Sequence, residues 1–223
     1  MTTTHFINRF QSSDSFAIWN TSLISDIPEN MNQLDRNQYF QDHYEEGFPR
    51  QIRKQWQQFS DEQWQQKMHA VHFVLVGLNS GDAGIKVPLF ENFHGRKADK
   101  NSNIAALVYD TPLEGAFMTE LAMNIESNSN KVNPRRVEVE SLYTHLTELE
   151  IPKSAIIIAM HAKVRDALGR TYSQKIRPFD TQTQYIAHYS YNQHLPQEVL
   201  NGKTVRDLES PISRATIEAL YQK

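Results

Sequence analysis

The sequence VHFVLVGLNSG, residues 71–81, decides the fold class of this chain. Its first six residues are mostly Val, Leu and Phe, and the run ends at Gly77, where a small polar loop begins. Such a run is typical of a strand that is buried on both faces of a parallel sheet covered by helices. Ligands of open α/β sheets bind just beyond the carboxyl ends of these strands. The loop after Gly77 is therefore the first candidate for a binding site.

Three more strands are predicted after this one, at residues 115–121, 155–160 and 183–187. Helical segments are predicted between and after them, at about 103–109, 133–149, 161–169 and 211–221. Strands that alternate with helices indicate α/β layering around a parallel sheet. We therefore expect an α/β fold with three layers (α/β/α) around a short, mainly parallel four-stranded sheet, with N-terminal helices added to it.

Residues 1–70 differ from the rest, because they are rich in Gln, Asn and aromatic residues and predict irregular helices. One helix is expected at about 31–45, and a second follows Pro49. Ser60 begins a third, since Gln63 stands at the position of a capping-box partner. The chain contains no repeat and no second candidate core. We therefore expect residues 1–223 to form a single domain, with 1–70 as a helical extension packed on it.

Composition excludes several classes of function. The 223 residues include no cysteine, which rules out disulfides, thiolate catalysis and cysteine-based zinc sites. The histidines show no metal-ligand spacing with carboxylates, so we expect neither a metal nor another cofactor. The formal net charge of −3 gives no overall attraction to nucleic acid, which would need a local basic patch.

The sequence also predicts no membrane partner. No window approaches the roughly 20 apolar residues that span a bilayer. The first residues lack a basic cluster followed by an apolar core, so they do not predict a secretory signal. We therefore expect a cytoplasmic protein. The sequence indicates no particular oligomeric state.

Polar residues stand at the ends of three predicted strands. They are Asn79 and Ser80, Thr119 and Glu120, and His188 and Ser190. A parallel sheet would bring these ends to one edge, and polar groups that converge at such an edge are typical of an active site. A long loop that includes residues 85–103 follows the first strand, and it carries aromatic and basic side chains. Long loops in compact domains are often functional.

These motifs resemble those of the uracil-DNA glycosylase superfamily. GLNSG at 77–81 is closest to the mismatch-specific branch, in which a Gly-x-Asn-Pro-Gly version occurs. FMTE at 117–120 and HYS at 188–190 follow in the order of the later family motifs, and the resemblance covers about residues 71–195. It implies a DNA-repair hydrolase that cleaves the N-glycosidic bond of a flipped-out, deaminated or damaged base. DNA or a nucleotide is the implied partner.

The resemblance also implies roles for single residues. Asn79 would hold the attacking water, and His188 would donate a hydrogen bond to the departing base. Phe90 or Phe93 would stack on the extruded base. The other residues expected around the substrate are Gly77, Leu78, Ser80, Gly81, Asp82, Thr119, Glu120 and Ser190.

The sequence departs from the family pattern at three positions of these motifs. Ser80 and Tyr189 stand where most relatives have proline, and Glu120 stands where relatives place a base-reading asparagine. An ionised carboxylate accepts hydrogen bonds and donates none. Glu120 therefore favours a base edge that carries an amino group. An amide such as Asn79 is too weakly basic to deprotonate water, which predicts slow turnover unless Asp82 assists.

Two other classes of function remain open. One is a protein that kept the glycosylase-like fold and pocket, lost catalysis, and binds a nucleotide or nucleic acid. The other is a doubly wound α/β enzyme that acts on an unrelated small molecule. Structural roles also remain open for single residues. Glu120 is also compatible with a paired or solvated carboxylate, His188 with a buried structural histidine, and His161 with capping or packing of the helix that follows the third strand.

Overall fold

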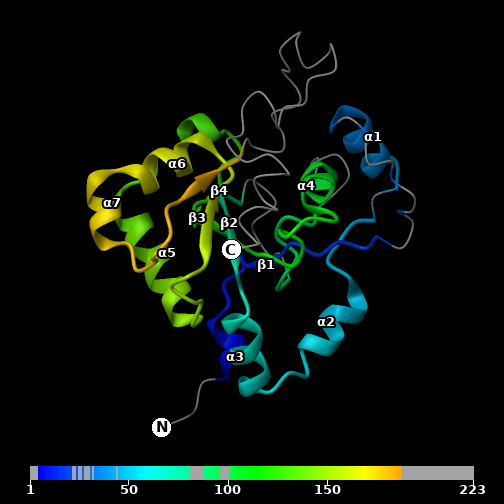
Figure 1. Cartoon of the computed structure of the whole chain (residues 1–223), viewed down its shortest axis with the longest axis horizontal. Helices are drawn as coiled ribbons and strands as arrows, with labels where there is room; N and C mark the ends of the chain where they lie inside the picture. The colour runs from blue at the N-terminus through cyan, green and yellow to red at the C-terminus, as the bar shows by residue number, and fades with distance from the viewer. Residues whose placement is uncertain are drawn as a thin grey trace.

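The computed structural model describes residues 5–21, 24, 27, 31, 33–43, 45–80, 88–95 and 101–186 (Figure 1). Its centre is a five-stranded mixed sheet with the strand order β1-β3-β2-β4-β5. The strands are β1 (Ser15–Phe16), β2 (Phe73–Asn79), β3 (Phe117–Ala122), β4 (Ile156–Ala159) and β5 (Gln184–Tyr185). The β3–β2, β2–β4 and β4–β5 pairs are parallel, whereas β1 runs antiparallel to β3.

The α/β class is thus confirmed, but the expectation of a mainly parallel four-stranded sheet is wrong. The added strand, β1, comes from the region that was expected to be helical. It is two residues long, and a strand this short has no room for the alternation by which strands are recognised in a sequence. The first predicted strand also continues past Gly77 as far as Asn79.

Seven α-helices surround the sheet among the described residues. They are α1 (Gln33–His43), α2 (Arg50–Trp56), α3 (Asp61–His69), α4 (Asn101–Val108), α5 (Arg136–Glu148), α6 (Ala162–Gly169) and α7 (Thr171–Ile176). Two short 3-10 helices, η1 (Phe6–Arg9) and η4 (Ser129–Lys131), complete the set. None of these helices is long and apolar enough to cross a membrane. The predicted closing helix at 211–221 lies outside the described residues.

Local sequence signals predicted the start of α3 correctly but not the start of α5. The capping box of α3 is confirmed: Ser60 Oγ accepts from Gln63 N, and Gln63 Oε1 accepts from Ser60 N. The helix expected from residue 133 instead begins at Arg136. Arg135 is the N-cap of this helix, and Glu138 Oε2 accepts from its backbone N–H.

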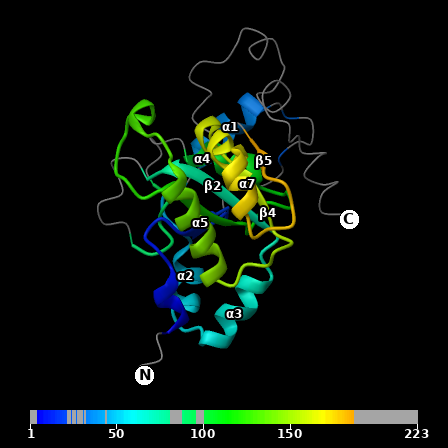
Figure 2. The ribbon, with the colours of Figure 1, turned by 90° about the vertical axis from the view of Figure 1, so that its left-hand side faces the viewer.

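Alternate residues of the central strands pack on opposite faces of the sheet. On β2, Val74 and Val76 belong to one core, and Phe73 and Leu75 belong to another. We call these the α5 face and the α4 face, because α5 contributes to the first core and α4 to the second. The two views show α5, α6 and α7 on one side of the sheet and α4 with α1 on the other (Figures 1 and 2).

The first seventy residues are built into both cores. Phe6 and Trp64, from η1 and α3, are fully buried on the α5 face, and Phe40 of α1 is buried on the α4 face. This part of the chain also supplies β1. It therefore contributes to the sheet as well as covering it.

Candidate functional site

The carboxyl ends of β2, β3 and β4 lie at one edge of the sheet, because these three strands are parallel. The chain passes from β2 to β3 on one side and then to β4 on the other side of β2. Such a reversal of strand order opens a crevice outside the carboxyl ends, where ligands of open α/β sheets bind. We call this the carboxyl edge.

Gly77, Asn79 and Glu120 lie together on the α4 face at the carboxyl edge. Gly77 is paired with Glu120 in the parallel register, and Asn79 is paired with Ala122. Side chains alternate along a strand. Positions 77 and 79 therefore follow Phe73 and Leu75 onto the α4 face, and Glu120 follows Met118.

The closest contact in this group is between Gly77 and the Glu120 carboxyl group. A Cβ atom on residue 77 would lie 2.1 Å from Oε2 and 2.8 Å from Cδ of Glu120. Real Cβ contacts are never so short, so only glycine leaves room for the carboxyl group in this position. The glycine at the end of the apolar run is explained by its neighbour on β3.

Glu120 is a buried acid with one hydrogen-bond partner. Its side chain is 7% exposed, and Oε1 accepts from Asn92 Nδ2 at 3.4 Å. Oε2 is buried and has no hydrogen-bond partner among the described residues. Burial raises the pKa of Glu120 to about 8, and the hydrogen bond from Asn92 opposes this rise only in part. The carboxyl group is therefore mostly neutral at pH 7.

Asn92 belongs to a short segment, residues 88–95, that is held against the N-terminal part of the chain. Its Nδ2 also donates to the carbonyl oxygen of Ser13 at 2.9 Å. Ser15 Oγ donates to the carbonyl oxygen of Phe90 at 2.7 Å. Phe90 and Phe93 both have φ close to +70°, in the left-handed region that costs free energy for any residue but glycine. These contacts hold the strained backbone and bring Asn92 to Glu120.

The amide of Asn79 is fixed by the chain that follows β3. Its Nδ2 donates to the carbonyl oxygen of Glu126 at 2.7 Å and, over a longer distance of 3.3 Å, to that of Asn124. Both hydrogens of the amide are therefore committed to backbone. Oδ1 is the atom that remains to accept a hydrogen bond from water or a ligand.

Thr119 lies on the α5 face, in a different network from Glu120. Its Oγ1 donates to Asp14 Oδ1 at 2.7 Å, and Asp14 Oδ2 lies 2.8 Å from His145 Nε2. All three side chains are buried. Sequence reasoning did not single out Asp14 or His145, because 131 residues separate them and neither stands in a recognisable motif.

The remaining predicted residues divide between the two faces. Phe93 belongs to the core of the α4 face, whereas Phe90 and Leu78 belong to the core of the α5 face. The Phe90 ring is fully buried among other aromatic rings, including Phe16 and Trp64. Ser80 directly follows β2. The other predicted residues, Gly81, Asp82, His188 and Ser190, lie outside the described part of the chain.

His161 caps α6, which confirms its predicted structural role at the start of that helix. Its Nδ1 accepts from the backbone N–H of Lys163 at 3.0 Å. Burial and the nearby ammonium group of Lys163 lower the pKa of His161. A neutral ring of this tautomer carries its proton on Nε2.

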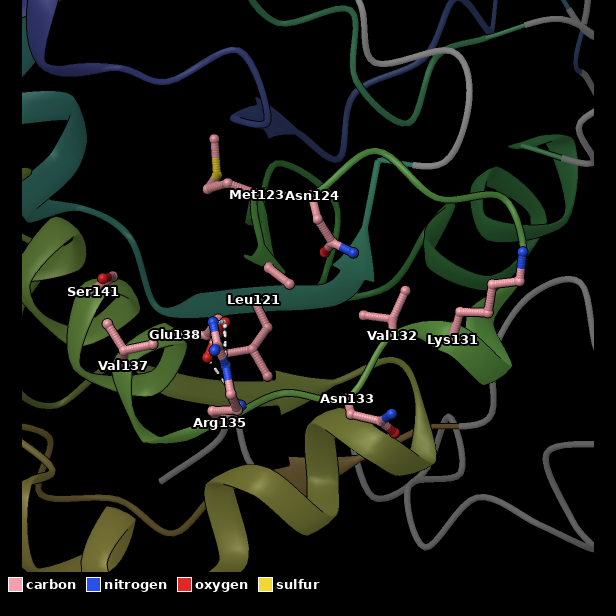
Figure 3. A pocket seen from close by; sticks show the side chains of 11 residues that line it. Leu121, Met123, Asn124, Lys131, Val132, Asn133, Arg135, Val137, Glu138 and Ser141 are labelled. Atoms are coloured by element: carbon pink, nitrogen blue, oxygen red, sulfur yellow. Dashed lines mark hydrogen bonds and ion pairs between the residues drawn. The ribbon is translucent and has the colours of Figure 1, made fainter.

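A groove of about 450 Å³ lies beyond the end of β3, between that strand and the start of α5 (Figure 3). It is lined by Leu121, Ala122, Met123, Asn124, Lys131, Val132, Asn133, Arg135, Val137, Glu138 and Ser141. Met123 and Val137 are more than half exposed. The Arg135 guanidinium is paired with Glu138 at 2.9 Å, and the Lys131 ammonium with Glu126 at 3.8 Å.

No predicted residue lines this groove, although Asn79 reaches it through the carbonyl group of Asn124. The groove was missed because its lining comes from the end of β3, the loop after it and the start of α5, and no polar motif links these segments in the sequence. Within the described ranges, no group of three or more His, Asp or Glu side chains is arranged to hold a metal ion.

No family model, curated protein or solved structure matches this chain.

Proposed function

We propose that this protein is a base-excision glycosylase of the uracil-DNA glycosylase type, which hydrolyses the N-glycosidic bond of a flipped-out base in DNA. The observation that carries the proposal is the contact of Glu120 with Gly77, with Asn79 on the same face of the carboxyl edge. An amide and a carboxyl group from neighbouring strands thus lie where ligands of open α/β sheets bind. Helices that contribute to cores on both faces support the α/β/α layering that the proposal implies.

In the proposed reaction, a water oxygen bonds to C1′ of the sugar while the bond from C1′ to the base nitrogen breaks. The electron pair leaves with the base, and the proton lost by the water passes to the departing base or to solvent. Asn79 would hold the water through Oδ1, because its Nδ2 is committed to two backbone carbonyls. It acts by positioning, since an amide is too weak a base to take the proton.

The remaining roles are proposals from the family resemblance. His188 would donate a hydrogen bond to the departing base, and Asp82 would assist the water. Both lie outside the described residues. Phe93 is a better candidate than Phe90 for stacking on the base, because only Phe93 lies in the core of the face that carries Glu120.

The test is release of base from a panel of duplexes that contain uracil, hypoxanthine, alkylated or mismatched bases. We expect any cleavage to fall at least tenfold in both Asn79→Ala and His188→Ala, a loss of about 1.4 kcal/mol or more in the barrier. Asn130→Ala, an exposed asparagine in η4, is the matched control and should cleave as the wild type does. Cleavage that survives both changes would show that the site lies elsewhere.

Paired surface charge favours the second candidate function, an inactive glycosylase-like protein that binds a nucleotide. Near the groove, Arg135, Arg136 and Lys131 are each paired with a carboxylate. Such pairs leave little net positive charge for a DNA backbone. Steeply salt-dependent DNA binding would support the glycosylase. Nucleotide binding that is unchanged in Asn79→Ala, with no release of base, would support the binding protein.

A further inference from the structure

The groove beyond β3 collects exposed apolar side chains. Among the described residues, the exposed large apolar side chains are Met123, Ile125, Val137 and Ile176. Met123 and Val137 line the groove, and Ile125 follows its lining residue Asn124 in the chain. Single exposed apolar residues are normal, whereas a group of them beside a hollow is typical of a binding site. The volume of about 450 Å³ also falls within the range of small-molecule sites.

The charged residues that line the groove leave one positive charge without a hydrogen-bonded partner. The Arg135 guanidinium donates to Glu138 Oε1 from two nitrogens, at 2.9 and 3.3 Å, so these two charges cancel. The Lys131 ammonium lies 3.8 Å from Glu126 Oε2, which is beyond hydrogen-bond distance. Its side chain is 68% exposed. Lys131 therefore has N–H donors available for a ligand.

The cation and the apolar side chains follow one another along the groove. Figure 3 shows Lys131 at one end and Val137 at the other, with Leu121 and Val132 between them in this view. Leu121 and Val132 are both buried, so they form the floor. A ligand that lies along the groove thus meets one positive charge and then apolar side chains.

Two side chains from other elements hold the walls of the groove in place. Lys163 of α6 donates from Nζ to the carbonyl oxygens of Ser129 and Val132, each at 2.7 Å. Asn79 of β2 donates from Nδ2 to the carbonyl oxygen of Asn124. The chain between β3 and α5 is therefore anchored near both ends of the groove. Binding to a surface that is already ordered costs less conformational entropy.

We propose that this groove binds an aliphatic monocarboxylate, with the carboxylate at Lys131 and the hydrocarbon chain extending over Leu121 and Val132. One negative charge complements the one positive charge that lacks a hydrogen-bonded partner. A neutral alcohol would leave this ammonium group without a counter-ion, and an alkylammonium ion would repel it. A nucleic-acid backbone would bring many negative charges to a groove that offers one cation. This binding site is separate from the reaction proposed at Asn79.

The first experiment compares four small probes by calorimetry on the full-length protein at low salt. Octanoate carries both features of the proposed ligand. Octanol keeps the chain without the charge, octylammonium reverses the charge, and acetate keeps the charge without the chain. We expect octanoate to bind at least tenfold more tightly than octanol, and neither octylammonium nor acetate to bind measurably.

The second experiment changes the two ends of the groove separately. Lys131→Gln removes the charge, so it should weaken octanoate at least tenfold and leave octanol unchanged. Val137→Ser removes apolar surface, so it should weaken both. Lys175→Gln, an exposed lysine of α7, is the matched control and should bind octanoate as the wild type does. All three residues are exposed, and circular dichroism checks that each variant is folded.

Several outcomes would overturn the proposal. Octanoate would then bind no more tightly than octanol, or equally well to Lys131→Gln and to Val137→Ser. The last probe is an uncharged peptide of aliphatic residues that is blocked at both ends. If this peptide binds, Val137→Ser abolishes its binding, and octanoate does not bind, the groove holds a segment of a protein and the proposed aliphatic acid is wrong.

Discussion

Gly77 and Glu120 form the contact on which the candidate site depends. A substitution that adds one methyl group at position 77 tests this contact. In Gly77→Ala, the new Cβ would lie 2.1 Å from Glu120 Oε2, so the carboxyl group must move and lose Asn92. Overpacking of this kind typically costs about 1–3 kcal/mol. We expect this loss in the free energy of unfolding measured with urea. It should shrink when Glu120→Ala is added, since the colliding atoms are then absent.

Gly169→Ala is the matched control for this change. A Cβ there would meet nothing within 4 Å, so we expect no loss of stability. A Gly77→Ala variant as stable as the wild type would contradict the contact.

At this scale, the sequence identified Gly77, Asn79 and Glu120 because they stand at the ends of predicted strands. It did not predict the neutral state of Glu120, because that state depends on burial and on Asn92, 28 residues away.

At the scale of secondary structure, the capping box of α3 is the best test of local signals. Ser60→Ala removes the side-chain oxygen that accepts from Gln63 N, so one N–H group at the start of the helix loses its partner. We expect a cost of about 1 kcal/mol in thermal or urea unfolding. Ser141→Ala, on an exposed position of α5, should change stability by less than about 0.5 kcal/mol. Equal effects of the two changes would refute the cap.

Elements with strong local signals were predicted, and elements set by distant contacts were not. Residues close together in the sequence form the apolar runs of β2 and β4 and the cap of α3. β1 exists only because Ser15 and Phe16 pair with β3, about a hundred residues later. The same limit applies to the site, where Asn92 reaches Glu120 only through its contact with Ser13.

For the whole molecule, the pH dependence of stability follows from two buried groups, His94 on the segment 88–95 and Glu120 on β3. Burial raises the pKa of Glu120 from 4.5 to about 8 and lowers the pKa of His94 from 6.5 to about 3. Between pH 4.5 and 8 the folded protein holds a proton on Glu120 that the unfolded chain has lost, so stability falls as pH rises. Between pH 6.5 and 3 the unfolded chain binds a proton that His94 does not, so stability falls as pH falls.

These two contributions oppose each other between pH 4.5 and 6.5, where we expect a plateau in the free energy of unfolding. Outside it, each group contributes a slope of at most about 1.4 kcal/mol per pH unit. Urea unfolding at intervals from pH 3 to 8 measures the curve. Glu120→Gln should flatten the alkaline side and His94→Phe the acid side, whatever each change does to absolute stability. An unchanged alkaline slope in Glu120→Gln would mean that the Glu120 carboxyl group is ionised in the folded protein and that burial does not raise its pKa.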